Sequence, residues 1–265
     1  MMIIAIASPT TVARERSYLN QGLEIMLLVD VSPSMAAQDI VGSSRLDQSK
    51  ATLLDFISKR GNDAIGLVAF GSDAALQCPL TQDATTIKQA LGQLEANMLG
   101  DGTSIGLGLA VAALHFSADP ARGKIIVLVS DGDNNAGEVT PLVAASLVKS
   151  EGVKVFSIGL GSDREVYLEY LDKAAGRRIS GTYQGRLDET LLRSIADQTA
   201  GQYFFAGAGN GLSTILDSID SAEQLRSPIR LTVVKTPLQN QFLFIGLLLI
   251  IGDLVMRRLV LREVV

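Results

Sequence analysis

The chain alternates short, continuous apolar runs with segments in which apolar residues recur every three or four positions. Runs of strand length cover 23–31, 64–70, 74–81, 124–130, 153–160 and 202–206. Helical patterns cover 44–59, 84–95, 105–116, 141–149, 187–199 and 212–221. Uninterrupted apolar runs are typical of strands buried on both faces, and intervening helices favour parallel pairing. The pattern therefore predicts an α/β domain with a doubly wound, mostly parallel, Rossmann-like sheet.

Short polar motifs mark where some elements begin, turn or are interrupted. Ser44-x-x-Asp47 resembles a capping box, and the Gly-Ser-Asp sequence at 71–73 predicts a hairpin between two apolar runs. The segment 161–187 interrupts the alternation and is interpreted as an insertion near the last strand. Its Arg and Tyr side chains are Arg164, Arg177, Arg178, Arg186, Tyr167, Tyr170 and Tyr183. Such a segment serves either as a partner-binding surface or as a solvated loop.

Composition excludes several classes of function. The 265 residues carry a net charge of −5 and only 5% aromatic residues, with no dense Lys/Arg stripe, so nucleic acid is not an expected partner. Cys78 is the only cysteine and His115 the only histidine, which excludes an internal disulfide and a zinc site of the usual Cys/His composition. His115 lies on an apolar helical stretch, where a packing role is expected.

Oxygen ligands gather in three short segments that follow a strand run or precede a helical pattern. Asp30 is followed by Ser32 and Ser34, and this alternate spacing puts three side chains on one side of an extended chain. Thr103 lies in the second segment and Asp131 in the third. Carboxylates and hydroxyls suit Mg²⁺ or Mn²⁺. Because the carboxyl ends of parallel strands meet at one edge of a sheet, we predict a divalent-metal site there.

The same residues allow other interpretations. In the simplest one, Asp30 and Asp131 only cap turns and helices. The sequence from Asp131 begins like an EF-hand loop, but it has Ala136 where that loop needs Gly and Leu142 where it needs Glu. The glycine-rich stretch 100–108 lacks the Gly-Lys-Ser/Thr of a phosphate-binding loop. Neither motif therefore replaces the predicted metal site.

The order Asp-x-Ser-x-Ser, then Thr after Gly, then Asp resembles the metal-ion-dependent adhesion site (MIDAS) of von Willebrand factor A domains. The resemblance implies that the metal site is formed by Asp30, Ser32, Ser34, Thr103 and Asp131. The hydroxyls would bind the ion directly, and the carboxylates directly or through water. A partner protein would then present an Asp or Glu side chain to the ion. Pro33 stands where Gly is common in the family, but this difference removes no ligand.

The stretch 238–256 is predominantly apolar and is followed at once by Arg257 and Arg258. As a helix it is about 28 Å long, close to the ~30 Å hydrocarbon thickness of a membrane. We predict one C-terminal transmembrane helix here, and a buried core helix is the alternative. Residues 1–8 are apolar but too short to span, and they resemble the last part of a further helix, so we expect the start of the chain to be truncated.

Longer phrases at 27–39, 78–81 and 131–138 resemble the bacterial Bat (aerotolerance) membrane proteins. The resemblance implies a single-pass protein of the cell (inner) membrane with a periplasmic A domain, assembling with other Bat-like proteins and a MoxR-type ATPase. The expected division is 1–20, a short apolar segment and linker; 21–225, the A domain; 226–237, a linker; 238–256, the transmembrane helix; and 257–265, a basic tail.

The expected function is therefore that of a membrane-anchored von Willebrand A domain that binds a partner protein through a divalent metal and is not an enzyme. One alternative is a metal-dependent hydrolase, for which His115 is poorly placed as a general base. Another is a structural subunit whose metal only stabilises the fold.

Overall fold

The computed structural model describes most of the chain. The described residues are 10–18, 22–38, 43–119, 122–161, 164–172, 176–185, 187–206, 229–237 and 239–259. The chain divides into two compact units, one of Asn20–Ser227 and one that joins Met1–Leu19 to Pro228–Val265. The predicted metal ligands all lie in the Asn20–Ser227 unit.

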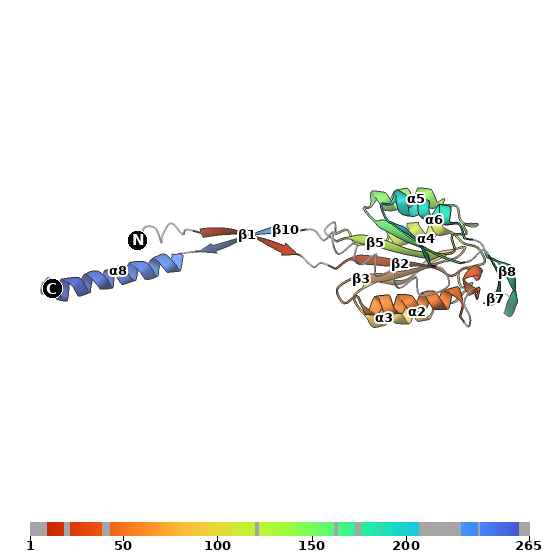
Figure 1. Ribbon diagram of the computed structural model, residues 1–265, viewed down its shortest axis with the longest axis horizontal. Coiled ribbons are helices and arrows are strands. Elements are labelled where there is room, and N and C mark those ends of the chain that lie inside the picture. Colours follow the sequence, from red (N-terminus) through yellow and green to blue (C-terminus); the bar gives the residue numbers. More distant parts are fainter. Residues whose placement is uncertain are drawn as a thin grey trace. The chain divides into compact units, whose positions relative to one another are not determined.

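A six-stranded sheet forms the centre of the Asn20–Ser227 unit (Figure 1). Its strands are β2 (Glu24–Asp30), β3 (Ala64–Phe70), β4 (Ala74–Thr81), β5 (Lys124–Ser130), β6 (Lys154–Leu160) and β9 (Tyr203–Ala206). Their order is β4-β3-β2-β5-β6-β9, and only the β3–β4 pair is antiparallel. The predicted mostly parallel sheet and the hairpin at 71–73 are confirmed. Because β2 and β5 are parallel neighbours, their carboxyl ends lie side by side.

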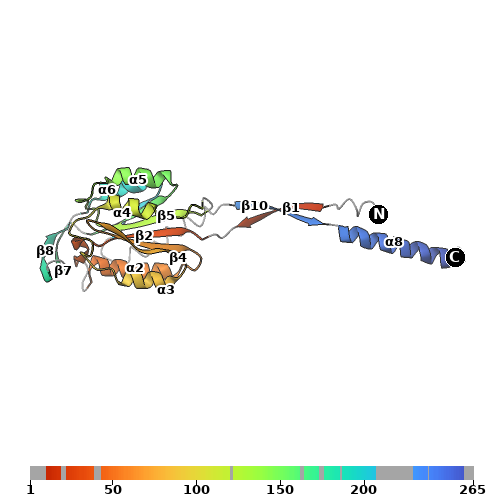
Figure 2. The same ribbon diagram turned by 180° about the vertical axis from the view of Figure 1, so that it is seen from behind.

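Helices cover both faces of this sheet (Figures 1 and 2). The two on one face are α2 (Arg45–Ser58) and α3 (Ala84–Gly92), and those on the other are α4 (Ile105–Ala113), α5 (Pro141–Ser150) and α6 (Glu189–Gln198). Each face has its own buried cluster, with Leu27 in one and its neighbour Leu28 in the other. Burial on both faces is why the strands read as continuous apolar runs.

The predicted insertion is a β-hairpin at the edge of the sheet where β2 ends (Figure 1). Strands β7 (Glu165–Asp172) and β8 (Arg177–Gln184) pair antiparallel. Ala37, next to the short 3-10 helix η1 (Pro33–Ala36), forms a bridge with Leu168, and the Gln38 N–H donates to the Tyr167 carbonyl at 2.8 Å. The hairpin therefore borders the segment that contains Ser32 and Ser34.

The described residues of the second unit form two strands and one helix. Strand β1 (Thr10–Tyr18) pairs antiparallel with β10 (Ile229–Pro237) over their whole lengths. These strands lie in the segments 1–20 and 226–237 that we expected to be linkers. Both strands are rich in β-branched residues, but a partner more than 200 residues away leaves no local signal of their pairing.

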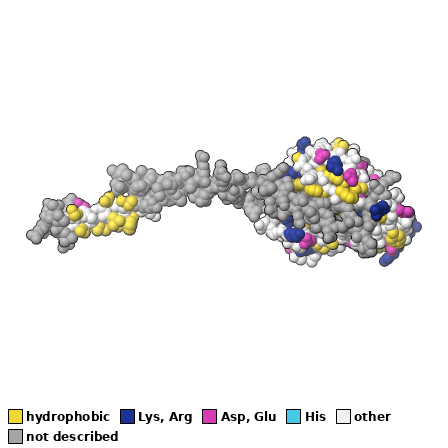
Figure 3. All heavy atoms as spheres, in the orientation of Figure 1, with side chains coloured by type: hydrophobic (Ala, Val, Ile, Leu, Met, Phe, Trp, Pro, Cys, Tyr) yellow, Lys and Arg dark blue, Asp and Glu magenta, His cyan; other side chains and the backbone are white. Residues whose placement is uncertain are grey.

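Helix α8 (Gln239–Leu259) includes the predicted apolar stretch from residue 239 on. Its described side chains between Leu243 and Met256 are mostly apolar and exposed (Figure 3). Searched over the described residues, the structure has no helix that is long and apolar enough to cross a membrane. The helix expected at 212–221 lies outside the described residues.

Candidate metal site

Side-chain contacts bring four of the five predicted ligands together. Asp30 is the last residue of β2, and its Oδ1 accepts the Ser32 N–H at 2.8 Å. The Ser32 and Ser34 hydroxyl oxygens are 3.0 Å apart. The Ser34 hydroxyl also lies near enough to lower the pKa of Asp131, which directly follows β5. The ends of β2 and β5 therefore bring Asp30 and Asp131 close to the two serine hydroxyls.

Ser130 connects the two strand ends. The Ser130 hydroxyl donates to Asp30 Oδ2 at 2.6 Å, and the Ser130 hydroxyl oxygen accepts the Gly132 N–H at 3.0 Å. Gly132 has a φ of +81°, and a Cβ there would lie 2.8 Å from the Asp188 carbonyl oxygen. A side chain at this position would thus meet both backbone strain and a steric clash.

Thr103, the fifth predicted ligand, joins the site through its backbone. Its N–H donates to Asn135 Oδ1 at 2.9 Å, and its carbonyl accepts the Asn135 and Ala136 N–H groups, both at 3.1 Å. Asn134 Oδ1 accepts the Ile105 N–H at 3.0 Å, at the start of α4. The loop after Asp131 therefore fixes the Thr103 loop, and Thr103 itself is buried.

A buried arginine completes the site. Arg45 begins α2, and its Nη1 donates to Asp131 Oδ2 at 3.2 Å. The side chains of Arg45 and Asp131 are 2% and 0% exposed, respectively. A charge-assisted contact of this kind, out of water, neutralises one of the two site carboxylates.

Burial controls the electrostatics of the two carboxylates. The pKa of Asp30 is raised from 3.8 to about 7, first by burial and then by the nearby Asp131 charge, and hydrogen bonds from Ser130 and Ser32 oppose the rise. Burial also raises the pKa of Asp131, against the lowering effects of the Ser34 hydroxyl and the Arg45 charge. Two mutually repelling carboxylates out of water are a favourable place for a cation.

The donor set fits a hard divalent ion. Among the described residues there is no group of three or more His, Cys, Asp or Glu side chains that would hold a metal. The site instead offers two carboxylates and adjacent serine hydroxyls. Oxygen donors of this kind favour ions such as Mg²⁺ or Mn²⁺ over softer metals.

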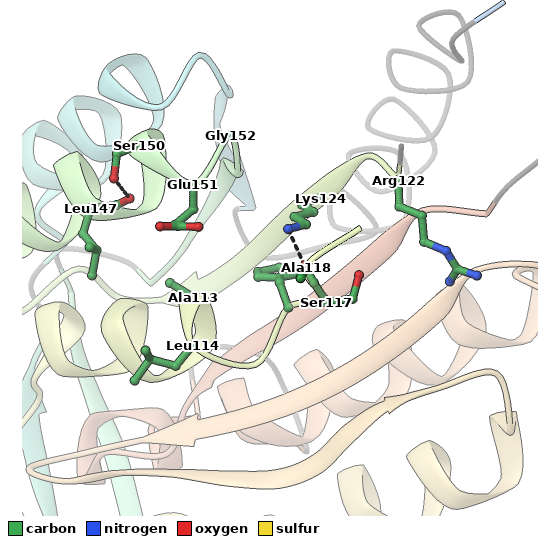
Figure 4. A pocket seen from close by; sticks show the side chains of 11 residues that line it. Ala113, Leu114, Ser117, Ala118, Arg122, Lys124, Leu147, Ser150, Glu151 and Gly152 are labelled. Carbon is green, nitrogen blue, oxygen red and sulfur yellow. Dashed lines mark hydrogen bonds between the residues drawn. The ribbon is translucent and has the colours of Figure 1, made fainter. Parts of the chain in front are cut away.

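A cavity of about 760 Å³ lies near the amino-terminal end of β5, away from the candidate metal site (Figure 4). Lys124, at the start of β5, lines it together with Ser117, Arg122 and Glu151. Asp131 follows the opposite end of the same strand. The cavity is therefore separate from the candidate metal site.

Sequence reasoning missed the residues that hold the ligands in place. Arg45 lies 86 residues from Asp131, and Asn135 lies 32 residues from the backbone group that it binds. The sequence could have indicated the role of Ser130, since this hydroxyl residue stands directly before a predicted ligand at a strand end. The pair Asn134-Asn135 had a weaker one, because Asn side chains often bind backbone groups in loops.

Residues 25–134 match the family described as von Willebrand factor type A domain. An uncharacterized protein from Borreliella burgdorferi is 29% identical over 264 residues, covering 100% of this chain and 77% of that protein. A UPF0353 protein from Mycobacterium sp. strain KMS is 28% identical, covering 78% of this chain. The chain spans 62% of the length of that mycobacterial relative.

The chain also resembles several solved structures. An aerotolerance-related membrane protein from Bacteroides fragilis is 28% identical with a TM-score of 0.63, covering 76% of this chain and 98% of that one. BatB from Bacteroides thetaiotaomicron is 26% identical with a TM-score of 0.65, covering 77% and 100%. A mussel byssus protein with a zinc-occupied MIDAS motif shares the fold at 20% identity, with a TM-score of 0.57, covering 89% of this chain and 51% of that one. The chain thus carries a von Willebrand factor type A domain and resembles the aerotolerance-related Bat proteins.

Proposed function

We propose that this chain is a membrane-anchored von Willebrand A domain that binds a partner protein through Mg²⁺ or Mn²⁺ and catalyses no reaction itself. The observation that carries the proposal is the buried carboxylate pair, Asp30 and Asp131, set beside the Ser32 and Ser34 hydroxyls. The fold also matches that of a mussel protein whose MIDAS motif is zinc-occupied. In this proposal Thr103 supplies the third hydroxyl.

The position of the site supports protein binding. Ligands of parallel sheets gather outside the carboxyl ends of the strands, which is where Asp30 and Asp131 lie. The β7–β8 hairpin borders this edge and exposes Tyr167 and Leu171, each close to half of its surface. An ion held by two carboxylates and neutral hydroxyls accepts a further anionic oxygen, so the partner donates an Asp or Glu side chain.

Hydrolysis is disfavoured by the position of the chain's only histidine. His115 follows the C-terminal end of α4, whose first residue, Ile105, bonds the loop beside Thr103. The ring of His115 is exposed, with Nδ1 2.7 Å from the Val111 carbonyl oxygen. It is therefore at the wrong end of the helix to activate a metal-bound water.

Two further features support the anchored assembly. The described part of α8 exposes apolar side chains from Leu243 to Met256, and the B. fragilis relative is named a membrane protein. Resemblance to Bat proteins extends the proposal to a single-pass protein of the inner membrane with a periplasmic A domain, assembling with Bat-like proteins and a MoxR-type ATPase.

Pull-down from detergent-solubilised membranes tests the function. The full-length chain should retain its partner in Mg²⁺ and lose it in chelator. Thr103→Ala should behave in Mg²⁺ as the wild type does in chelator, whereas Thr52→Ala, which changes a threonine in α2, should bind normally. Circular dichroism must show that Thr103→Ala is folded, because an unfolded variant at room temperature would instead favour a structural metal. Equal binding with and without Mg²⁺ would refute the proposal.

A further inference from the structure

Arg45 is a permanent positive charge inside the candidate metal site. Its Nη1 is 3.2 Å from Asp131 Oδ2, and both side chains are almost completely buried. The Ser34 hydroxyl lies near enough to Asp131 to lower its pKa, and Asp131 lies near enough to Asp30 to raise the pKa of Asp30. The guanidinium therefore shares Asp131 with the other groups that would hold an ion.

The fold fixes this arginine independently of any metal. Its N–H donates to the Ala37 carbonyl at 3.0 Å, and its own carbonyl accepts the Ser49 hydroxyl at 2.8 Å. The guanidinium packs against Gly161, where a Cβ would lie 3.2 Å from Arg45 Cζ. The hydrogen bonds at the start of α2 thus fix the backbone of Arg45, and the missing side chain at Gly161 leaves room for its guanidinium.

Counting formal charges shows what this arrangement does. Asp30 and Asp131, when ionised, leave one net negative charge beside Arg45. A divalent ion converts this to one net positive charge. A single carboxylate from a partner would then make the site neutral. Without the arginine, the metal-loaded site would already be neutral before any partner arrived.

We propose that Arg45 is an internal cation that competes with the divalent ion for Asp131, so that the ion binds weakly alone and tightly when a partner carboxylate is added. This inference rests on the proposed metal-dependent binding of a partner. Arg45 is a positioning residue in this scheme: it orients Asp131 and lowers metal affinity, but it does not touch the ion. Its charge makes metal occupancy depend on the partner.

The test is calorimetric titration of the full-length chain in detergent with Mg²⁺ and, separately, Mn²⁺. Arg45→Met should bind the metal about tenfold more tightly than the wild type or better, because it removes a buried like charge. Arg45→Lys keeps the charge and should stay within about threefold of the wild type. Arg60→Met is the matched control: Arg60 is also buried and paired, to Asp63 at 2.8 Å, but next to the start of β3 at the opposite edge.

The outcomes separate this inference from the proposed function. If Arg45→Met binds the metal no more tightly than the wild type, the competition is refuted while the metal site stands. If the wild type and all variants bind neither ion, the proposed function fails as well. Should Arg45→Met not fold even in Mg²⁺, Arg45→Gln, which keeps a hydrogen-bond donor without the charge, is judged by the same criterion.

Discussion

Replacing Asp30 by Asn should stabilise the metal-free protein at neutral and alkaline pH. Asp30 is fully buried and its pKa is raised to about 7, chiefly by that burial and then by Asp131. The amide preserves both neighbouring contacts, because its oxygen accepts the Ser32 N–H and its NH₂ group donates to the Ser130 hydroxyl. The variant thus removes the buried charge and little else.

The sign and size follow from linkage. Between pH 3.8 and about 7 the folded state keeps the Asp30 proton that the unfolded state releases, so wild-type stability falls as the pH rises through this window. The stabilising contribution of the protonated form is complete below pH 3.8 and lost above about pH 7. The difference between these pKa values corresponds to about 4 kcal/mol at neutral to alkaline pH.

Urea denaturation in chelator, followed by circular dichroism, measures the effect. The stability gain of Asp30→Asn over the wild type should grow by about 3 kcal/mol between about pH 5 and about pH 8. Mg²⁺ should stabilise the wild type at the higher pH, where the ion replaces the proton, and should leave the variant almost unchanged. A difference that does not vary with pH, or a variant less stable than the wild type at about pH 8, would refute this reasoning.

Three further predictions test other parts of the structure. Asn135→Ala removes the acceptor for the Thr103 N–H and should weaken Mg²⁺ binding about tenfold, with an unchanged circular-dichroism spectrum; unchanged affinity in calorimetry would contradict this. Gly132→Ala, at a φ of +81°, should lower the urea midpoint by the equivalent of at least about 1 kcal/mol, and an unaltered midpoint would count against the tight turn. A chain ending at Thr236 should stay in the soluble phase, whereas the full chain should need detergent. The reason is that the described part of α8 exposes eleven large apolar side chains, and removing them all from water is favourable by on the order of 20 kcal/mol.

Local sequence features predicted most of the elements in the unit that holds the candidate metal site. Ser44 does accept the Asp47 N–H and precedes α2, and the apolar runs became strands because both faces of the sheet are covered. Lys124–Ser130 was predicted to the residue. Helix ends were less predictable: α3 ends at Gly92, where the sequence pattern runs on to 95, because glycine disfavours helix interiors.

The sequence predicted that Asp30 and Asp131 lie close together, but it did not predict the contacts that support them. Asp30 and Asp131 stand at strand ends, so the parallel sheet alone brings them together. Arg45 comes from the start of a helix that carries no ligand, and its contact with Asp131 depends on how α2 packs. The pairing of β1 with β10 also could not be predicted from local sequence, because it joins segments that are remote in the chain.

The most direct test of the central claim is the position of a bound ion. Crystals of the protein grown with Mn²⁺ should give one anomalous peak beside the carboxyl ends of β2 and β5, within about 2.0–2.6 Å of the Ser32 and Ser34 hydroxyl oxygens. The peak should disappear in crystals of Ser34→Ala. A peak elsewhere, or no peak in Mn²⁺-saturated crystals that diffract well, would contradict the assignment of Asp30, Ser32, Ser34, Thr103 and Asp131 as the metal site.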